Sequence, residues 1–554
     1  MAKTEQKMYN ERRFHAFREI IDYCAETYGK APAFHIKNSD GSFRYISYLE
    51  LKDRFYALCN VFLDLGLGEK RIAVTGSNCF EWVLSYLCAA TVGVAVPIDK
   101  ELDPEDIRSF LELAECDAVC ADDLRMKGIQ STGDTPWRCL SFSGVLARSG
   151  EVSPERDRVW QREIKKDEMH VLLFTSGTTG SSKGVCLSQD NICSDIYSTV
   201  SVVKITTGDK TLSVLPLHHT YECTLNCLLL LSRGACICYN GGLTRLQKDL
   251  VLYSPTVLVV VPALLKLLSR RLQKSVASEL PDRYRAVFAD KSLGEGVNAL
   301  PFFMRKIVVS RVRKALGGKL RLFIVGAAEL DTTLVEDFGA LGIRTLQGYG
   351  LTECSPLVAG NSDFYHNPAS TGIAIPGVEV RIDNPNEEGV GEIITRGDNV
   401  MLGYYRDEEA TAQVLRDGWF HTGDLGRMDE EGGLYITGRL KNVIVTSNGK
   451  NIYPEELETR LSQHEEISEV LVMADKKNGE EFIKAKILPN LEVLRERLGH
   501  LPTREEISSS VQKVIQEVNE RIPQYKHIKV VDILTEALEK TTTQKIKRFG
   551  NNTK

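Results

Sequence analysis

The chain has no excess of basic residues. Its 554 residues include 69 Lys and Arg against 75 Asp and Glu, which gives a net charge of −6. Proteins that bind the phosphate backbone of nucleic acids depend on a cationic excess, so we expect no nucleic-acid partner. Hydrophobic residues make up 43% and charged residues 26% of the chain. This is the balance of an ordinary globular protein and excludes a disordered or collagen-like chain.

Paired cysteine motifs are also missing. The 14 cysteines are scattered, no C-x-x-C pair occurs, and the closest two are Cys236 and Cys238. Zinc sites and disulfide frameworks need characteristic spacings, so the sequence favours buried, reduced thiols. Met1–Arg13 is polar and lacks the apolar run of a secretory signal. We therefore expect a cytoplasmic protein.

The chain contains no long uninterrupted apolar run. Its most apolar window is Val251–Leu268, and this window includes Ser254, Pro255, Pro262 and Lys266. The pattern indicates a buried strand followed by the start of a helix rather than a membrane span. We expect no transmembrane segment, and peripheral contact with a membrane stays open.

Short apolar segments alternate with helical patterns up to about residue 370. Apolar positions three and four residues apart predict a helix over Phe14–Cys24. Strands separated by helices are typical of parallel α/β layers. The expected strands are Arg71–Thr75, Val94–Ile98, Ala118–Cys120, Leu212–Leu215, Val257–Val261 and Leu322–Val325.

The pattern changes near residue 371. Thr371–Arg439 is dense in Gly, Asp and short alternating runs, which predict a compact antiparallel β unit. After Lys441 a βα pattern returns over about 110 residues, the size of a separate small domain. The predicted fold class is α/β: a large N-terminal α/β domain of several subdomains with a compact β unit, and a small α+β C-terminal domain. The C-terminal elements expected are the strands Asn442–Val445, Glu469–Met473 and Phe482–Ile487 and the helix Pro454–Gln463.

The strongest chemical signal lies within Leu172–Val185. An apolar strand leads into Thr175–Gly184, which contains only Thr, Ser, Gly and Lys. Glycines let backbone amides converge on an anion, hydroxyls add donors and Lys183 adds positive charge, so the segment predicts a polyphosphate cradle. A standard P-loop needs Gly at 182 and Ser or Thr at 184, where this chain has Ser182 and Gly184. A P-loop NTPase is therefore disfavoured.

Five further motifs follow this phosphate loop in a fixed order. They are Gly348–Glu353, Gly418–Gly426, Gly438–Ile444, Asn448–Glu456 and Lys540–Arg548. Together they make the chain, over roughly residues 15–550, resemble the adenylate-forming superfamily of acyl-CoA synthetases, peptide-synthetase adenylation domains and firefly luciferase. The resemblance implies an AMP-binding domain over residues 1–438, a hinge at 439–441 that includes Lys441, and a mobile C-terminal domain over residues 442–554.

The resemblance also implies a two-step reaction. A carboxylate attacks the α-phosphorus of ATP, pyrophosphate leaves, and the acyl-adenylate then forms a thioester with the co-substrate CoA. Because charge spreads over phosphoryl oxygens in the first step, the protein should supply cations and donors rather than a covalent nucleophile. Lys545 matches the family lysine that bridges the carboxylate and the α-phosphate. Here Gln544 replaces the usual Gly, and the neighbouring cations are Lys540, Lys547 and Arg548.

The remaining site residues follow from the same motifs. Glu353 and Thr175 are the expected Mg²⁺ ligands, and Thr352 is an expected catalytic neighbour. Tyr349 offers a flat face to adenine, Asp424 can accept both ribose hydroxyls, and Gly449 leaves room for the pantetheine thiol in the second step. The full set of expected nucleotide and cofactor contacts is Thr175, Ser176, Gly177, Thr178, Thr179, Gly180, Lys183, Gly326, Ala327, Ala328, Gln347, Gly348, Tyr349, Gly350, Asp424, Arg439 and Gly449.

The acid substrate is less well specified. In the family, the segment His218–Glu222 borders the carboxylate pocket, so His219 is expected to meet the acyl group. Phe302–Glu329 and Thr352–Gly360 look most like long-chain fatty acyl-CoA synthetases, which favours a medium or long fatty acid. An acyl carrier protein as acceptor and an aromatic or steroidal acid as substrate stay open. A non-catalytic binder or a luciferase-like oxygenase is disfavoured because the chain retains Glu353, Asp424, Arg439 and Lys545.

Overall fold

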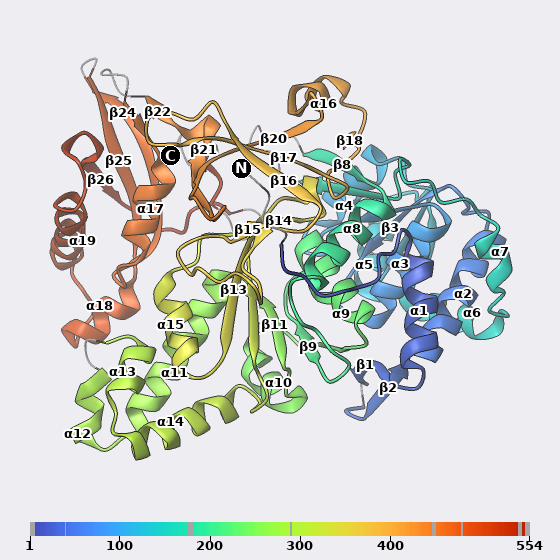
Figure 1. Ribbon diagram of the computed structural model, residues 1–554, viewed down its shortest axis with the longest axis horizontal. Coiled ribbons are helices and arrows are strands. Elements are labelled where there is room, and N and C mark those ends of the chain that lie inside the picture. Colours follow the sequence, from blue (N-terminus) through green and yellow to red (C-terminus); the bar gives the residue numbers. More distant parts are fainter. Residues whose placement is uncertain are drawn as a thin grey trace.

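The computed structural model describes residues 6–38, 40–175, 182–288, 291–445, 450–477, 480–540 and 546–548. Within them the expected fold class is confirmed, with a large α/β domain followed by a small C-terminal one (Figure 1). The helices of the large domain are α1 (Phe17–Tyr28), α2 (Tyr48–Asp64), α3 (Phe80–Val92), α4 (Pro104–Leu113), α5 (Asp123–Ser131), α6 (Phe142–Glu151), α7 (Arg156–Trp160), α8 (Gln189–Val200), α9 (Leu229–Ser232), α10 (Leu246–Tyr253), α11 (Pro262–Glu279), α12 (Asp282–Arg285), α13 (Leu293–Ala299), α14 (Phe302–Ala315), α15 (Thr332–Ala340) and α16 (Glu408–Val414), with short helical turns η1 (Tyr221–Leu228), η2 (Leu243–Arg245), η3 (Ala286–Phe288), η4 (Thr352–Cys354) and η5 (Leu440–Asn442).

The larger sheet of this domain has nine strands in the order β15-β14-β13-β12-β11-β9-β10-β1-β2. Pairing is parallel from β13 to β1 and antiparallel at both edges. Its central strands are short, continuous apolar runs because helices cover a parallel sheet on both faces. The strands are β1 (Pro32–Lys37), β2 (Phe43–Ser47), β9 (Lys210–Ser213), β10 (Cys236–Tyr239), β11 (Val257–Val260), β12 (Leu322–Val325), β13 (Arg344–Gly350), β14 (Leu357–Gly360) and β15 (Ile373–Ala374).

A second sheet has seven strands in the order β18-β8-β7-β4-β3-β5-β6. Its core is parallel, whereas β7, β8 and β18 pair antiparallel. The strands are β3 (Arg71–Thr75), β4 (Val94–Pro97), β5 (Ala118–Ala121), β6 (Arg138–Ser141), β7 (Val171–Thr175), β8 (Lys183–Leu187) and β18 (Gly403–Tyr404).

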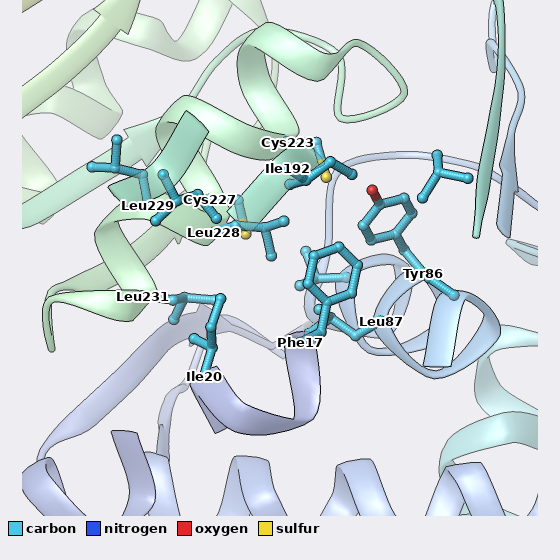
Figure 2. Packing of buried hydrophobic residues seen from close by; sticks show 14 of the residues in the cluster. Phe17, Ile20, Tyr86, Leu87, Ile192, Cys223, Cys227, Leu228, Leu229 and Leu231 are labelled. Carbon is cyan, nitrogen blue, oxygen red and sulfur yellow. The ribbon is translucent and has the colours of Figure 1, made fainter. Parts of the chain in front are cut away.

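Apolar side chains from several helices form the main core. Figure 2 shows Phe17 of α1 beside Tyr86 and Leu87 of α3, and Ile20 of α1 beside Leu231 of α9. All 14 cysteines are free thiols, and most of them are buried, as the sequence predicts. No helix in the described part of the chain is long and apolar enough to cross a bilayer.

The expected antiparallel β unit is present. It comprises β16 (Val378–Asp383), β17 (Gly391–Gly397), β19 (Leu415–Arg416), β20 (Trp419–Met428) and β21 (Leu434–Arg439). Two strands within Thr371–Arg439 depart from the expectation, because β15 pairs with β14 in the nine-stranded sheet and β18 joins the seven-stranded sheet. β18 leaves this unit and pairs with β8, so Gly403 lies opposite Cys186 and Tyr404 opposite Val185.

The C-terminal domain has its own core of Ile452, Leu457, Val472, Ile487 and Val511. It meets the large domain through polar contacts: Thr459 Oγ1 donates to Glu329 at 2.6 Å, and the Lys274 ammonium lies 2.8 Å from Glu496. Its elements are β22 (Ile444–Val445), β23 (Asn451–Ile452), α17 (Pro454–Ser462), β24 (Ile467–Lys477), β25 (Glu480–Pro489), α18 (Leu491–Leu498), α19 (Arg504–Asn519), η6 (Gln524–Lys526) and β26 (Ile528–Ile533).

Some expected boundaries were wrong. The first helix begins at Phe17 rather than Phe14, and Asn442 lies in η5 rather than in a strand. The strand expected over Leu212–Leu215 is β9, which ends at Ser213. The chain turns there because Asn78 Nδ2 donates to the Leu215 carbonyl at 2.6 Å, which removes that group from the sheet.

The turn η1 is a π-helix that buries a carboxyl group. Glu222 is fully buried, and its Oε1 accepts hydrogen bonds from Ser213 Oγ at 2.5 Å and from Asn226 Nδ2 at 2.7 Å. Burial raises the pKa of Glu222 from its usual 4.5 to about 8. The side chain is therefore neutral in the folded protein at pH 7.

This shift makes stability depend on pH in a defined direction. Between pH 4.5 and about 8 the unfolded chain releases the Glu222 proton while the folded chain retains it, so stability falls as pH rises. We expect Glu222→Gln to match the wild type near pH 5 and to become relatively more stable towards pH 8, with a slope of at most roughly 1.4 kcal/mol per pH unit. Urea denaturation at several pH values measures this. Glu388→Gln, at an exposed loop position, is the control, and a constant difference across the range would contradict the assignment.

Candidate functional site

Three parallel strands, with β11 between two of them, end at the same edge of the nine-stranded sheet. β9 leads towards His218 and His219, β12 leads directly into Gly326–Ala328, and β13 ends at Gly350. In open α/β sheets, ligands bind outside the carboxyl ends of the strands. The topology therefore gathers three of the expected site segments at one edge.

The expected phosphate loop joins β7 to β8. Thr175 pairs with Lys183 across this hairpin, and Thr175 Oγ1 donates to the Lys183 carbonyl at 3.4 Å. In a standard P-loop a helix follows the loop, whereas here a strand follows, in agreement with the motif analysis. The loop residues Ser176, Gly177, Thr178, Thr179 and Gly180 lie outside the described residues.

Glu353 lies in η4 and belongs to a cluster with Lys183. The Tyr404 hydroxyl donates to Glu353 Oε1 at 3.0 Å, and Lys183 Nζ lies 4.5 Å from the centroid of the Tyr404 ring. Burial, reinforced by the charge of Glu353, raises the pKa of Tyr404, so this phenol stays protonated and keeps donating. Sequence reasoning missed Tyr404. Its role depends on the pairing of β18 with β8, which no local pattern predicts.

The donors in this cluster suit a hard divalent cation. Glu353 offers a carboxylate and Thr175 a hydroxyl, and Mg²⁺ prefers such oxygen ligands. Within the described residues, no Lys, Arg or His forms an ion pair with Glu353. Its negative charge is thus available to a cation, and these two residues fit the expected metal.

A second cluster centres on the carboxylate of Asp424. Tyr349 donates from its hydroxyl to Asp424 Oδ2 at 2.8 Å, and Arg439 Nε lies 2.8 Å from Asp424 Oδ1. β20 and β21 place Asp424 and Arg439 opposite each other. The charge of Asp424 raises the pKa of Arg439, and burial raises the pKa of Tyr349. The three expected nucleotide contacts therefore meet from three strands.

The loop Gly326–Ala328 is fixed by a tyrosine that sequence reasoning did not single out. The Tyr221 hydroxyl donates to the carbonyls of Val260 and Ile324, both at 3.0 Å, and so joins η1 to β11 and β12. A Cβ on Gly326 would lie only 3.2 Å from the Tyr221 ring. Ala327 has a φ of 72°, an uncommon conformation for a non-glycine residue that occurs at ligand-binding loops.

The expected substrate histidine, His219, lies two residues before Tyr221, whose ring packs against Gly326. The rings of His218 and His219 are 3.9 Å apart, and both precede Tyr221 in the same turn. Burial, then His219 and Lys100, lower the pKa of His218 and favour a neutral imidazole. His219 thus belongs to the same turn as the tyrosine that packs against Gly326.

The end of β13 packs tightly against the following strand. Gln347 is buried and lies opposite Val325 of β12. A Cβ on Gly348 would lie 2.7 Å from Leu357, and one on Gly350 would lie 1.9 Å from the Pro356 carbonyl oxygen. Close backbone packing alone therefore requires glycine at position 350. The next residue but one, Thr352, begins η4.

The C-terminal site residues are described only in part. Gly449 and Lys545 lie outside the described residues, while Lys441 is exposed within η5. Two of the cations near Lys545 have structural partners: Lys540 Nζ lies 2.6 Å from Glu469, and Arg548 Nη2 lies 2.7 Å from Glu458. The flanks of the Lys545 segment are thus anchored to their own domain.

Two known proteins are similar to this chain in sequence. The long-chain-fatty-acid–CoA ligase FadD15 of Mycobacterium bovis is 28% identical to this chain, over 92% of this chain and 90% of that protein. The long-chain-fatty-acid–CoA ligase 1 of Homo sapiens is 27% identical, over 84% and 72%. Among solved structures, ATP-bound MatB from Rhodopseudomonas palustris superposes with a TM-score of 0.75 at 25% identity, over 96% of this chain and 98% of that one.

Family matches cover both domains in order. Residues 21–405 match the AMP-binding enzyme family, and residues 441–549 match the AMP-binding enzyme C-terminal domain. The first match alone spans well over half of the chain. The chain belongs to the AMP-binding enzyme family and is an enzyme of the AMP-forming acid–CoA ligase type.

Proposed function

We propose that this enzyme uses ATP to convert a medium- or long-chain fatty acid into an acyl-adenylate, and then transfers the acyl group to CoA. The observation that carries the proposal is the meeting of two clusters at the end of β13. One is Glu353 with Tyr404 and Lys183, and the other is Tyr349 with Asp424 and Arg439. The first suits phosphates with a cation, and the second suits a nucleoside.

In the proposed first step, a carboxylate oxygen of the acid bonds to the α-phosphorus of ATP and the bond to pyrophosphate breaks. Lys183 and the loop that follows β7 bind the departing phosphates. Glu353 and Thr175 hold Mg²⁺, which when bound neutralises charge on the phosphate oxygens. Thr352 lies beside Glu353 and completes this part of the site.

The nucleoside half is oriented by the second cluster. Asp424 already accepts one hydrogen bond on each oxygen, and each oxygen retains a lone pair for a ribose hydroxyl. Tyr349 and Gly326–Ala328 border the adenine. Gln347, Gly348 and Gly350 supply the backbone of β13 on the same side of the adenine. Lys545 bridges the acid carboxylate and the α-phosphate, where it stabilises the charge that develops.

In the proposed second step, the C-terminal domain (442–554) turns about residues 439–441, and Gly449 replaces Lys545 at the acyl-adenylate. Support comes from the interface between the domains, which uses polar contacts such as Thr459–Glu329 and Lys274–Glu496. Interfaces of this kind permit relative motion more readily than large apolar ones. The thiol of CoA then attacks the acyl carbonyl and AMP leaves.

The fatty-acid substrate is supported by the two long-chain-fatty-acid–CoA ligases among the relatives. His219, in the same turn as Tyr221, is the residue we assign to the border of the acyl pocket. An acyl carrier protein instead of CoA, or an aromatic or steroidal acid, is the alternative. Fourteen free thiols support a reducing compartment such as the cytoplasm.

The first test separates the two half-reactions. We expect Lys545→Ala to lower acyl-adenylate formation, measured as pyrophosphate release, on the order of 10²-fold or more, because a charge contact to the transition state is lost. Thioester formation from supplied acyl-adenylate should change far less. Lys547→Ala is the neighbouring control. Equal loss in both half-reactions would overturn the role of Lys545.

The second test concerns the hydrogen bond to Glu353. Tyr404→Phe keeps the ring beneath Lys183 and removes only the hydroxyl, so we expect kcat/KM for adenylation to fall by about tenfold or more. The Mg²⁺ concentration for half-maximal activity should change as well. Tyr405→Phe, the adjacent tyrosine, is the matched control. If both variants behave alike, Tyr404 does not orient Glu353.

The third test measures the acid preference. Each methylene removed from water contributes roughly 0.8 kcal/mol, so kcat/KM should rise several-fold per two carbons and then level off where the pocket ends. Pyrophosphate release is assayed with acids from butyrate to palmitate and with benzoate, coumarate and a bile acid, with and without CoA. A flat alkyl series with a strongly preferred ring acid would refute the fatty-acid substrate and leave the adenylation chemistry intact.

A further inference from the structure

Positive charge is concentrated in one part of this acidic chain. Residues 262–321 carry fourteen Lys and Arg against four Asp and Glu, although the whole chain has a net charge of −6. In the structure this stretch forms α11, α12, α13 and α14, which lie together with α12 and α14 along the lower edge of the molecule in Figure 1. We call α12–α14 the basic lobe.

Three cations of α11 have partners in the C-terminal domain, whereas the cations of the basic lobe have none among the described residues of that domain. Lys266 Nζ donates to the Ser462 carbonyl at 2.7 Å, and Lys274 pairs with Glu496 at 2.8 Å. By contrast, no carboxylate in the described part of the chain forms an ion pair with Arg305, Lys306 or Lys314 of α14. These three side chains are exposed.

The few acidic groups nearby are already engaged. Glu279 lies 3.3 Å from Arg311, and Asp282 lies 3.3 Å from Arg285. Glu295 closes the capping box of α13 with Ser292. Three of the four acidic residues are thus held in local contacts, and the fourth, Asp290, lies outside the described residues.

Two phenylalanines project from the same lobe. Phe302 and Phe303 begin α14 and are each 73% exposed, the highest values among the aromatic side chains that the structure describes as exposed. Val308 and Val312 bury the opposite side of the helix. Helical spacing places both phenylalanines on the solvent side with Lys306 and Lys314, and Lys306 Nζ lies 4.5 Å from the centroid of the Phe302 ring.

We propose that the basic lobe docks on an anionic lipid bilayer, with Phe302 and Phe303 inserted at the boundary between headgroups and acyl chains. Exposed aromatic side chains beside unpaired Lys and Arg are the features of segments that lie on anionic membranes. Lys306, Lys314 and Arg305 contact the lipid phosphates. This inference stands on the surface of the protein and does not require the proposed acid substrate.

Other occupants fit this surface less well. A nucleic acid would satisfy the cations and would leave two adjacent phenyl rings at a helix start without a matching apolar surface. A symmetric dimer through this lobe would place two strongly positive surfaces against each other, which is unfavourable. A bilayer supplies negative charge and an apolar layer together.

The first experiment is co-sedimentation of the full chain with phosphatidylcholine vesicles, with and without phosphatidylglycerol, at low and high salt. We expect binding only with the anionic lipid and loss of binding at high salt. Phe302→Ser with Phe303→Ser, and Arg305→Glu with Lys306→Glu, should each reduce binding by about tenfold or more. The controls are Leu124→Ser with Leu243→Ser, also exposed apolar positions, and Lys166→Glu with Lys248→Glu.

A second measurement follows insertion directly. Phe302→Trp should show a blue-shifted emission with anionic vesicles and quenching by brominated acyl chains. Unchanged emission of Phe302→Trp would overturn the proposal, and so would vesicle binding by the Phe302→Ser/Phe303→Ser variant equal to that of the wild type. A wild-type dimer that becomes monomeric in this variant would also overturn it. Pyrophosphate release with a soluble acid and no vesicles should be equal in wild type and surface variants, so this assay reports the proposed function separately from docking.

Discussion

One buried carboxylate, that of Asp424, joins the nine-stranded sheet to the β unit of the large domain. It accepts from Tyr349 at the end of the nine-stranded sheet and pairs with Arg439 at the end of the β unit. Arg439 is also the last residue of β21, immediately before the η5 turn that leads to the C-terminal domain. A buried charge is stable only when its partners are in place, because removing one partner leaves an uncompensated charge. The sheet, the β unit and the start of the small domain are therefore positioned together.

Much of this organisation could be predicted from the sequence. Apolar runs gave β3, β11 and β12 almost to the residue, and the start of α17 at Pro454 was also correct. These elements are specified by local burial and by residues such as proline that restrict the backbone. The nucleotide motifs likewise named Tyr349, Asp424 and Arg439 together, and the structure brings these three side chains into contact.

The parts that could not be predicted depend on contacts between distant segments. Tyr404 reaches Glu353 only because β18 leaves the β unit and pairs with β8. Tyr221 was identified only from the structure, where its hydroxyl joins η1 to β11 and β12. The net charge is a sum over the whole chain, so it did not reveal the local excess of Lys and Arg in α11–α14. Periodicity and composition report the neighbours of a residue along the chain, whereas these features depend on its neighbours in space.

The contacts between the two domains have a consequence for how the solvent affects the enzyme. Lys274–Glu496 and Arg270–Glu465 lie on the surface, where an ion pair contributes little and where dissolved salt weakens it further. In the Asp424–Arg439 pair the carboxylate is buried and the guanidinium is partly exposed, and dissolved salt screens a partly buried pair less than a surface pair. Ionic strength therefore acts selectively on this molecule: it loosens the attachment of the small domain while the nucleoside cluster stays assembled. A salt dependence of turnover would then report the arrangement of the domains rather than the chemistry at the phosphate.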